Sequence, residues 1–373
     1  MTANSASSIE LPTLTPAVLH ACSFPTWYRS FPQHTFRSTV ITLDQAHIDY
    51  LRDTRHGLHL PEELAPATSQ LSDSEDGAET ADTSSAKSSS SSSSSSRTSS
   101  PPPRRYSFPE LTRKIAETIE MYGGSVFPKL NWSAPQDAGF LLVSGDGPLR
   151  CRAPADVYML LKGSDCIFHD LDVHAKLPPA SPGAAFPVVL VLREWFNLNP
   201  AHEFRCFVRA RKLMAISARS STYYDFLLPD EVRQSIVTRI GSFFDSVISP
   251  QFDLSDFIFD VYLKNPTTTV PLAATKPNLK LVDINPFAAY IDPCLFSYEE
   301  LEQSYSAISA ESDQKLHVAP LLRVVESEHP HQHCRASKFQ ASKLPAEFVN
   351  YSQNQDVNRL SDEFSTMLQA ERR

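Results

Sequence analysis

Glycine is scarce in this chain, and long hydrophobic runs are missing. Only 10 of the 373 residues are glycine, so we do not expect a glycine-rich phosphate loop as the main binding device. No stretch approaches the roughly 20 apolar residues that cross a bilayer, and the N-terminus lacks the basic and apolar regions of a signal peptide. We therefore expect a cytoplasmic protein without a membrane partner.

Basic residues and paired cysteines are also few. Lys and Arg number 34 against 43 Asp and Glu, which gives a net charge of −9 and disfavours direct nucleic-acid binding through phosphate neutralisation. The six cysteines are scattered without a CxxC pair, a pattern typical of reduced thiols inside the cell. The GxSxG, Walker lysine and HExxH motifs are absent, so the corresponding hydrolase and NTPase classes lose support.

Hydrophobic residues are nevertheless plentiful, at 41% of the chain, which is enough for a sizeable core. Residues 65–105 interrupt this pattern, because an acidic patch leads into an unbroken serine run at 88–96 with almost no apolar residue. Such a segment buries too little surface to offset its chain entropy. We predict a disordered, Ser-rich linker there.

Helical and strand-like patterns occur on both sides of this linker. Apolar residues recur at helical spacing over 107–122 and 230–248. Residues 203–209 and 213–219, separated by a short polar turn, indicate a hairpin. Further strands are expected at 38–43, 126–132, 186–193, 257–263 and 279–285. Interspersed helices and strands favour an α+β fold, followed by an irregular segment at 308–343 and a final helix at 355–371.

The end of the last predicted strand carries the clearest candidate site. Strand alternation places Asp283 and Asn285 on one face, together with Leu281. Asp260 lies on the preceding predicted strand, and pairing of the two strands would complete a three-oxygen set suited to Mg²⁺. The alternative is that Asp283 and Asn285 are turn formers before the following proline.

Lys129 is a candidate phosphate ligand. It lies in an apolar strand, where a lone ammonium group needs an anion, and phosphate is a natural one. Trp132 close by offers a ring face to a base. The alternative is that the Lys129 side chain reaches the surface and that Trp132 is ordinary core.

Two arginines in the hairpin are further candidates. Arg205 and Arg219 lie near opposite ends of the hairpin sequence, so they are expected to face each other across the pair. Together with Lys129 they would form a polyphosphate clamp, because each guanidinium group can bind two oxygens. The alternative is a structural ion pair with Glu203 or Glu194.

The chain resembles the cell division cycle protein 123 family in four segments that occur in the same order: 126–137, 189–195, 203–208 and 281–287. Residues 20–28 and 344–349 fit the family too, so the resemblance spans about 20 to 370 apart from the linker. It implies an ATP-grasp-like, two-lobed fold with antiparallel and mixed sheets that binds ATP with Mg²⁺. It also implies an assembly chaperone for eukaryotic translation initiation factor 2, which binds the gamma subunit of that factor and promotes joining of the alpha subunit.

The resemblance further implies which residues form the site. The phosphate lysine falls on Lys129, and the phosphate-facing arginines fall on Arg205 and Arg219. The metal ligands fall on Asp260, Asp283 and Asn285. The residues implied next to the base are Trp132, Ala134 and Asp137, and those of the strand along the adenine are Val191, Leu192 and Arg193, with Trp195 close by.

Three departures from the family pattern affect partner contacts rather than the nucleotide site. No acidic residue follows Arg219 directly, the linker is rich in serine instead of mainly acidic, and the loop at 265–277 is long.

The resemblance also suggests how the chain divides. We expect the N-terminal part of the first lobe at 1–64, the linker at 65–105, the first lobe at 106–195, the second lobe with the metal site at 196–307, and a partner-binding segment at 308–373. The expected partner surface at the N-terminus consists of Phe24, Trp27, Tyr28 and Phe31. These aromatic residues could equally pack in a core.

The function therefore has a preferred and an alternative interpretation. The preferred one is a monomeric ATP- and Mg²⁺-binding chaperone without an established turnover reaction. The alternative is an ATP-grasp ligase that activates a carboxylate as an acylphosphate, since the same clamp and metal site would serve that chemistry. A regulatory kinase is disfavoured because the kinase catalytic-loop and Gly-rich motifs are missing.

Overall fold

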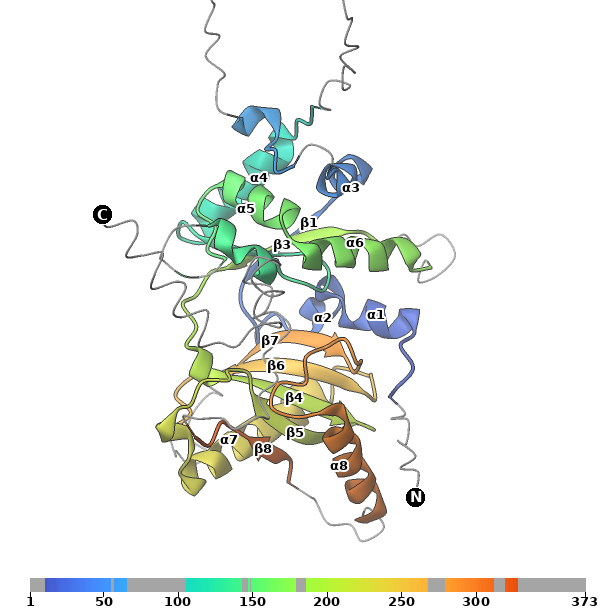
Figure 1. Ribbon diagram of the computed structural model, residues 1–373, viewed down its shortest axis with the longest axis vertical. Helices are drawn as coiled ribbons and strands as arrows, with labels where there is room; N and C mark the ends of the chain where they lie inside the picture. The colour runs from blue at the N-terminus through green and yellow to red at the C-terminus, as the bar shows by residue number, and fades with distance from the viewer. Residues whose placement is uncertain are drawn as a thin grey trace, which may run out of the picture.

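The computed structural model describes residues 11–54, 57–65, 105–142, 147, 149–178, 186–267, 279–311 and 319–327. Within these residues the strands form two sheets, one of three strands in the order β1-β3-β2 and one of five in the order β7-β6-β4-β5-β8. Figure 1 shows the two sheets in separate lobes, with helices α3 to α6 around the smaller sheet. The predicted α+β, two-lobed fold with antiparallel and mixed sheets is confirmed.

The first lobe is built on the smaller sheet. Strand β3 (Val189–Glu194) lies in its centre and pairs antiparallel with β1 (Ser38–Thr42) and with β2 (Val126–Lys129). Leu190 and Leu192 pack on the helical side, whereas Val189 and Val191 on the other face join the core of the second lobe. The helices of this lobe are α3 (Gln45–Arg52), α4 (Pro109–Met121), α5 (Pro154–Lys162) and α6 (Asp165–Lys176), with short turns η1 (Glu62–Leu64) and η2 (Gln136–Leu141).

The second lobe is built on the larger sheet. The predicted hairpin of β4 (Glu203–Arg209) and β5 (Lys212–Ala218) is confirmed, as is the antiparallel pair of β6 (Phe257–Leu263) and β7 (Leu279–Pro286). Helix α7 (Asp230–Phe243), continued by the π-helical turn η5 (Phe244–Ile248), covers one face through Ile236 and Ile240. Helix α8 (Tyr298–Glu311) packs through Leu301 against a separate cluster that contains Phe207. Two short turns complete the lobe, η3 (Pro200–His202) and η4 (Asp225–Leu227).

Strand β8 (Leu321–Arg323) was not predicted. It lies in the segment expected to be irregular, and it pairs in parallel with β5. The second lobe therefore extends beyond residue 307. A strand of three residues has too little periodicity to be recognised from sequence, since its pairing depends on a partner about 100 residues away.

The N-terminal helices lie between the two lobes in Figure 1. They are α1 (Pro16–Cys22) and α2 (Phe24–Ser30). Phe24, Trp27 and Phe31 are 0%, 1% and 0% exposed and belong to the core of the second lobe. The prediction that these aromatic residues form an exposed partner surface is therefore wrong, and the alternative of core packing holds, because apolar side chains of the larger sheet and α7 bury them. Tyr28 is half-buried and packs against the same core.

Several predictions fall outside the described residues. These are the linker apart from its two end residues, the segment at 344–349, the final helix at 355–371 and most of the loop at 265–277. Among the described helices, none combines the length and the apolar character required to cross a bilayer. The five described cysteines are all free thiols, as predicted.

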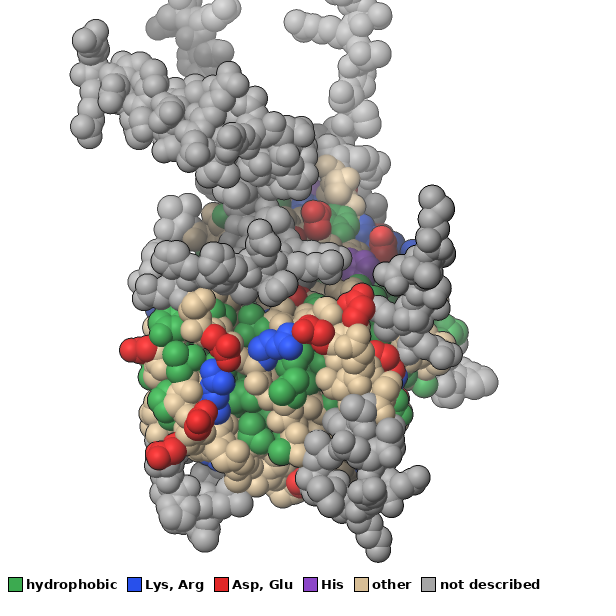
Figure 2. Space-filling view, turned by 60° about the horizontal axis from the view of Figure 1, so that its bottom comes forward, with side chains coloured by type: hydrophobic (Ala, Val, Ile, Leu, Met, Phe, Trp, Pro, Cys, Tyr) green, Lys and Arg blue, Asp and Glu red, His purple; other side chains and the backbone are tan. Residues whose placement is uncertain are grey.

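On the face of the second lobe drawn in Figure 2, acidic and basic side chains lie next to one another among hydrophobic ones. Elsewhere in the second lobe too, acidic and basic side chains are paired: Arg233 with Glu326 at 3.0 Å and Arg323 with Glu300 at 2.9 Å. The described part of this face therefore presents no broad basic patch of the kind that binds nucleic acid.

Candidate functional site

A row of polar side chains crosses the larger sheet at one level. From β5 to β7 the residues in register are Ser217, Arg205, Asp260 and Asp283. Residues directly opposite each other on paired strands point to the same face of a sheet. The row faces away from the core that contains Phe259, the neighbour of Asp260 on β6. The sheet thus brings together charged residues that lie far apart in the sequence.

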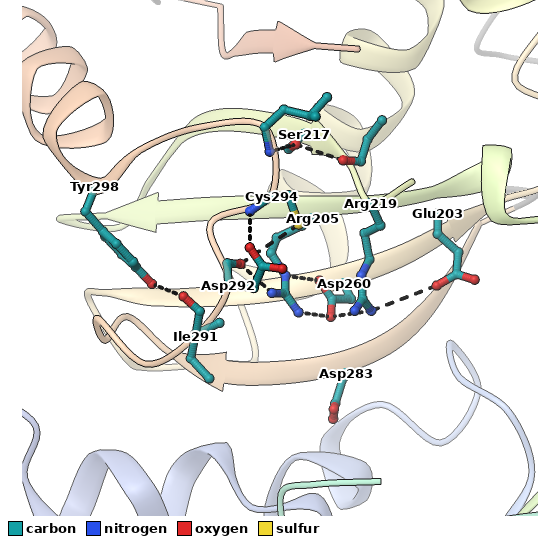
Figure 3. Close-up of polar contacts among 12 residues, drawn as sticks. Glu203, Arg205, Ser217, Arg219, Asp260, Asp283, Ile291, Asp292, Cys294 and Tyr298 are labelled. Carbon is teal, nitrogen blue, oxygen red and sulfur yellow. Dashed lines mark hydrogen bonds and ion pairs between the residues drawn. The ribbon is translucent and has the colours of Figure 1, made fainter. Parts of the chain in front are cut away.

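Both predicted arginines bind the carboxylate of Asp260. Arg205 donates from Nε and Nη2 to Oδ1 and Oδ2 at 2.8 Å each, and Arg219 donates from Nη1 to Oδ2 at 3.0 Å, as Figure 3 shows. Burial alone would raise the pKa of Asp260, but the two guanidinium charges outweigh burial and hold the pKa below its ordinary value. The two arginines meet at Asp260, although Arg205 is directly opposite Ser217 on β5 and not opposite Arg219. Their role in a polyphosphate clamp stays a prediction.

Glu203 extends this cluster at its other end. Its Oε2 lies 3.9 Å from Arg219 Nη1, so the alternative of an ion pair with Glu203 is present as well. Burial raises the pKa of Glu203, and the charge of Arg219 opposes this. We did not predict Glu203 as a site residue, although its position two residues before Arg205 on one strand indicates a shared face. Glu194 lies outside the cluster and pairs with Arg37 at 2.7 Å.

Asp283 connects the two lobes. Lys129 on β2 donates from Nζ to Oδ1 and Oδ2 of Asp283 at 2.8 and 2.9 Å. Figure 3 shows Asp283 pointing from β7 away from the sheet, towards the N-terminal segment. Burial lowers the pKa of Lys129, and the carboxylate of Asp283 partly offsets this. Lys129 is 2% exposed, so the alternative of a lysine that reaches the surface is wrong. The anion that binds it in this structure is Asp283, and a contact with phosphate stays a prediction.

The strand that carries Asp283 contains a β-bulge. The register of β6 and β7 shifts after Asp260, so that Val282 has no partner on β6. Leu281, before the bulge, is fully buried in the core of the second lobe. Our prediction that Leu281 shares the face of Asp283 is therefore wrong, because alternation holds only along a regular strand. Asp283 and Asn285 lie after the bulge with consecutive partners and keep their predicted common face.

The three predicted metal ligands are neighbours in the sheet. Asp260 and Asp283 are directly opposite each other, and Asn285 lies two residues further along β7 on the same face. The described residues contain no cluster of three or more His, Cys, Asp or Glu side chains that could hold a metal ion, so a metal site here needs the amide oxygen of Asn285. An all-oxygen set suits Mg²⁺, whose remaining positions are usually filled by waters and phosphate oxygens. The donor chemistry fits that ion, and the assignment stays a prediction.

Asp170 fixes the loop that carries Trp132. Its Oδ2 accepts hydrogen bonds from the backbone N–H groups of Trp132 and Ser133 at 3.0 and 2.8 Å. The indole Nε1 of Trp132 donates to the carbonyl oxygen of Leu19 at 2.9 Å. Burial raises the pKa of Asp170, although these hydrogen bonds oppose it. Trp132 is thus held by hydrogen bonds to Asp170 in the first lobe and to Leu19 in α1. Its contact with a base stays a prediction. Asp170 lies in a helix that we did not predict, so no local signal marked it.

The other predicted base neighbours have structural contacts in the first lobe. Asp137 accepts hydrogen bonds at the start of α6, from Ser164 Oγ at 2.6 Å and from the backbone N–H of Asp165 at 2.7 Å. Ala134 packs against the core of the first lobe. Negative charge at a helix N-terminus is stabilising, so Asp137 has a sufficient role in the fold. Neither contact tests a role in base binding.

The strand predicted to lie along an adenine is the central strand of its sheet. Residues 191–193 are in register with β1 on one side and with β2 on the other, so their backbone has no free edge for a base. The side chains of Val191 and Leu192 are buried in opposite cores. Trp195 follows β3, and its ring lies 4.5 Å from Arg150 Cζ. The prediction that an adenine lies along these residues therefore rests on the resemblance alone.

Comparisons with known proteins give a consistent result. A family model described as D123 matches residues 27–352. Proteins named "Translation initiation factor eIF2 assembly protein" from Sclerotinia sclerotiorum and Xenopus tropicalis are 32% and 33% identical, over 94% and 91% of this chain and 87% and 93% of theirs. The solved structure titled "Structure of Cdc123 from Schizosaccharomyces pombe" is 27% identical with a TM-score of 0.59, and the match covers 85% of this chain and 100% of that one.

Proposed function

The chain belongs to the D123 family, and from this premise we propose that it is an assembly factor for eukaryotic translation initiation factor 2. The relatives from Sclerotinia sclerotiorum and Xenopus tropicalis carry that function in their names and align along most of their length with this chain. The resemblance found in the sequence is confirmed at the level of the family. The finer parts of the proposal, a nucleotide and a subunit of the factor, rest on the site described above.

The nucleotide part of the proposal is ATP with Mg²⁺, bound between the lobes. The observation that carries it is the meeting of Lys129 from the first lobe with the row on the second lobe at Asp283. The cationic side chains of the site are Lys129, Arg193, Arg205 and Arg219, and the carboxylates in and around it are Asp170, Glu203, Asp260, Asp283 and Asp292. Four cationic side chains next to clustered oxygen ligands suit a polyphosphate with a divalent cation.

Each side chain has a distinct task in this proposal. Lys129 would hold a phosphate group as a compact charge, whereas Arg205 and Arg219 would exchange N–H contacts that now go to Asp260 for contacts with phosphate oxygens. Asp260, Asp283 and Asn285 would hold the Mg²⁺ ion. ATP with Mg²⁺, when bound, supplies a polyanion and a cation that compete with the existing ion pairs of these residues.

The ion pair of Lys129 with Asp283 suggests how binding affects the shape of the protein. The two residues belong to different lobes, so the pair contributes to holding the lobes in one arrangement. A ligand that exchanges this pair for contacts of its own shifts the population of lobe arrangements. In the proposal, one arrangement binds the gamma subunit and favours joining of the alpha subunit, without a bond-making step.

A binding experiment tests this function. The purified chain is titrated with ATP and Mg²⁺ and with the gamma subunit, and nucleotide release is followed in the same samples. Tight binding of both ligands with negligible turnover supports the assembly factor. ADP released in proportion to a covalently modified partner would instead support the ligase alternative, and absence of gamma-subunit binding would contradict the proposal.

A further inference from the structure

Arg193 occupies an unusual position for a residue of a central strand. Its backbone is in register with Ser38 on β1 and with Phe127 on β2, so only its side chain is available to a ligand. The side chain lies on the same face of the sheet as Lys129, because Lys129 is in register with Val191, two residues before Arg193. This face is the one that turns towards the second lobe.

The guanidinium group of Arg193 is buried without adequate partners. The residue is 6% exposed, and Nε and Nη2 have no hydrogen-bond partner among the residues described. Its Cζ lies 5.2 Å from the ring centroid of Phe24 and 5.7 Å from that of Phe36. Aromatic rings stabilise a cation but accept no strong hydrogen bond. Buried charges are normally paired because an unpaired one is costly, so two unused donors here call for an explanation.

The surroundings of Arg193 belong to the candidate site. The ring of Phe24 that contacts Arg193 also lies 5.3 Å from Lys129 Nζ. Asp283 is the carboxylate whose charge favours the protonated form of Arg193, and it already binds Lys129 through both oxygens. Lys129 is therefore compensated by Asp283 and by the nearby charge of Asp170, whereas Arg193 has only the carboxylate charge of Asp283, whose oxygens already accept hydrogen bonds from Lys129.

Arg209 on β4 is a second buried arginine that contacts aromatic rings, and it serves as a comparison for Arg193. It is 8% exposed and lies between the rings of Phe287 and Tyr305. Its Nε has no hydrogen-bond partner among the described residues, but unlike Arg193 it donates to two carboxylates, Asp256 at 2.9 Å and Glu302 at 3.1 Å. Burial and aromatic contacts are thus alike at the two arginines, and the carboxylate partners distinguish them.

We propose that the Arg193 side chain is an anion-binding group of the interlobe site, with Nε and Nη2 held free for oxygens of the phosphate chain. This inference rests on the proposed nucleotide function and changes the role that the resemblance implied for Arg193, from an adenine contact to a phosphate contact. Phe24 and Phe36 act as positioning residues, because they hold the guanidinium group without occupying its donors.

The test compares Arg193→Met with the matched control Arg209→Met. Binding of ATP with Mg²⁺, of inorganic tripolyphosphate and of adenosine is measured by competition with a fluorescent ATP analogue, and thermal unfolding is measured without ligand. We expect Arg193→Met to weaken ATP and tripolyphosphate binding about 10- to 100-fold and to leave adenosine binding unchanged. Its unfolding temperature should stay the same or rise, because an unpaired buried charge is removed. Arg209→Met should unfold at a lower temperature and bind all three probes as the wild type does.

Three results would overturn the inference. Unchanged tripolyphosphate binding by folded Arg193→Met would exclude a phosphate contact. Equal losses for adenosine and ATP would indicate a base contact. A drop in unfolding temperature like that of Arg209→Met, with unaltered affinities, would indicate a purely structural residue. If the wild-type chain binds neither ATP nor tripolyphosphate, the nucleotide part of the proposed function fails together with this inference.

Discussion

Asp260 and Asp283 lie directly opposite each other on β6 and β7, yet their charges are neutralised from different lobes. Asp260 binds Arg205 and Arg219 within its own sheet, whereas Asp283 binds Lys129 from the first lobe. Two adjacent carboxylates repel each other unless cations or a metal ion compensate them. The cations hold the pair together in this structure, and the same pair of carboxylates is where we expect Mg²⁺.

Asp283→Ala tests the metal assignment. Loss of one carboxylate ligand should weaken binding of ATP in the presence of Mg²⁺ by about tenfold or more and remove most of the dependence on Mg²⁺, with the far-ultraviolet circular dichroism spectrum retained. Calorimetric titration with and without Mg²⁺ measures both effects. Asp172→Ala is the control, because Asp172 is exposed and pairs with Arg52 away from the site. An unchanged, Mg²⁺-dependent affinity in Asp283→Ala would show that the metal assignment is wrong.

The ion pair between the lobes can be measured with a double-mutant cycle. Lys129→Met leaves Asp283 without its partner, and we expect it to lower the free energy of unfolding by about 1–3 kcal/mol. Adding Asp283→Asn should recover part of this loss, because the uncompensated carboxylate is removed. Urea denaturation of the four proteins gives the coupling energy. Effects that add within about 0.5 kcal/mol would mean that the pair does not couple the two positions.

We expect Asp260 to make the free energy of unfolding depend on pH in the acidic range. Because its folded pKa is held below the ordinary value of 3.8, the carboxylate stabilises the fold at pH values above 3.8, and this contribution is lost as the pH falls through the folded pKa. Asp260→Asn leaves Arg205 without its charged partner, so we expect a loss of about 3–5 kcal/mol near neutral pH. Urea denaturation is measured at pH 7 and at several pH values below 4. The difference in free energy of unfolding between Asp260→Asn and the wild type should become smaller as the pH falls. A difference in free energy of unfolding that is independent of pH would contradict the lowered pKa of Asp260.

The buried N-terminal aromatic residues should matter for stability and not for direct partner contact. Phe24 is fully buried, so we expect Phe24→Ala to lower the free energy of unfolding by about 3–5 kcal/mol. Phe140 is 66% exposed, and Phe140→Ala should change stability by less than about 0.5 kcal/mol. Chemical denaturation of both variants measures the difference. If Phe24→Ala were as stable as the wild type but did not bind the gamma subunit, Phe24 would contact the partner directly, contrary to this prediction.

Local patterns in the sequence predicted many of the elements. The apolar stripes of α4 and α7 and the runs of β3, β4, β5, β6 and β7 were recognised, since they depend on residues a few positions apart. Helices α1, α2, α3, α5, α6 and α8 were not predicted, although Ile167 and Leu171 of α6 lie at helical spacing and are buried. The bulge at Val282 was not predictable either, because it exists only as a mismatch between two paired strands.

By itself, the sequence determined the α+β class, the family resemblance and the residue types of the site, because composition and spacing along one chain carry that information. The tertiary structure decided which charges meet. Lys129 and Asp283 are 154 residues apart in the chain, and their contact depends on how two lobes with separate cores pack against α1 and α2. Register likewise decided that Asp260 faces Asp283, and burial decided that Arg193 holds unused donors beside them. Such long-range pairings follow from packing, which no local pattern encodes.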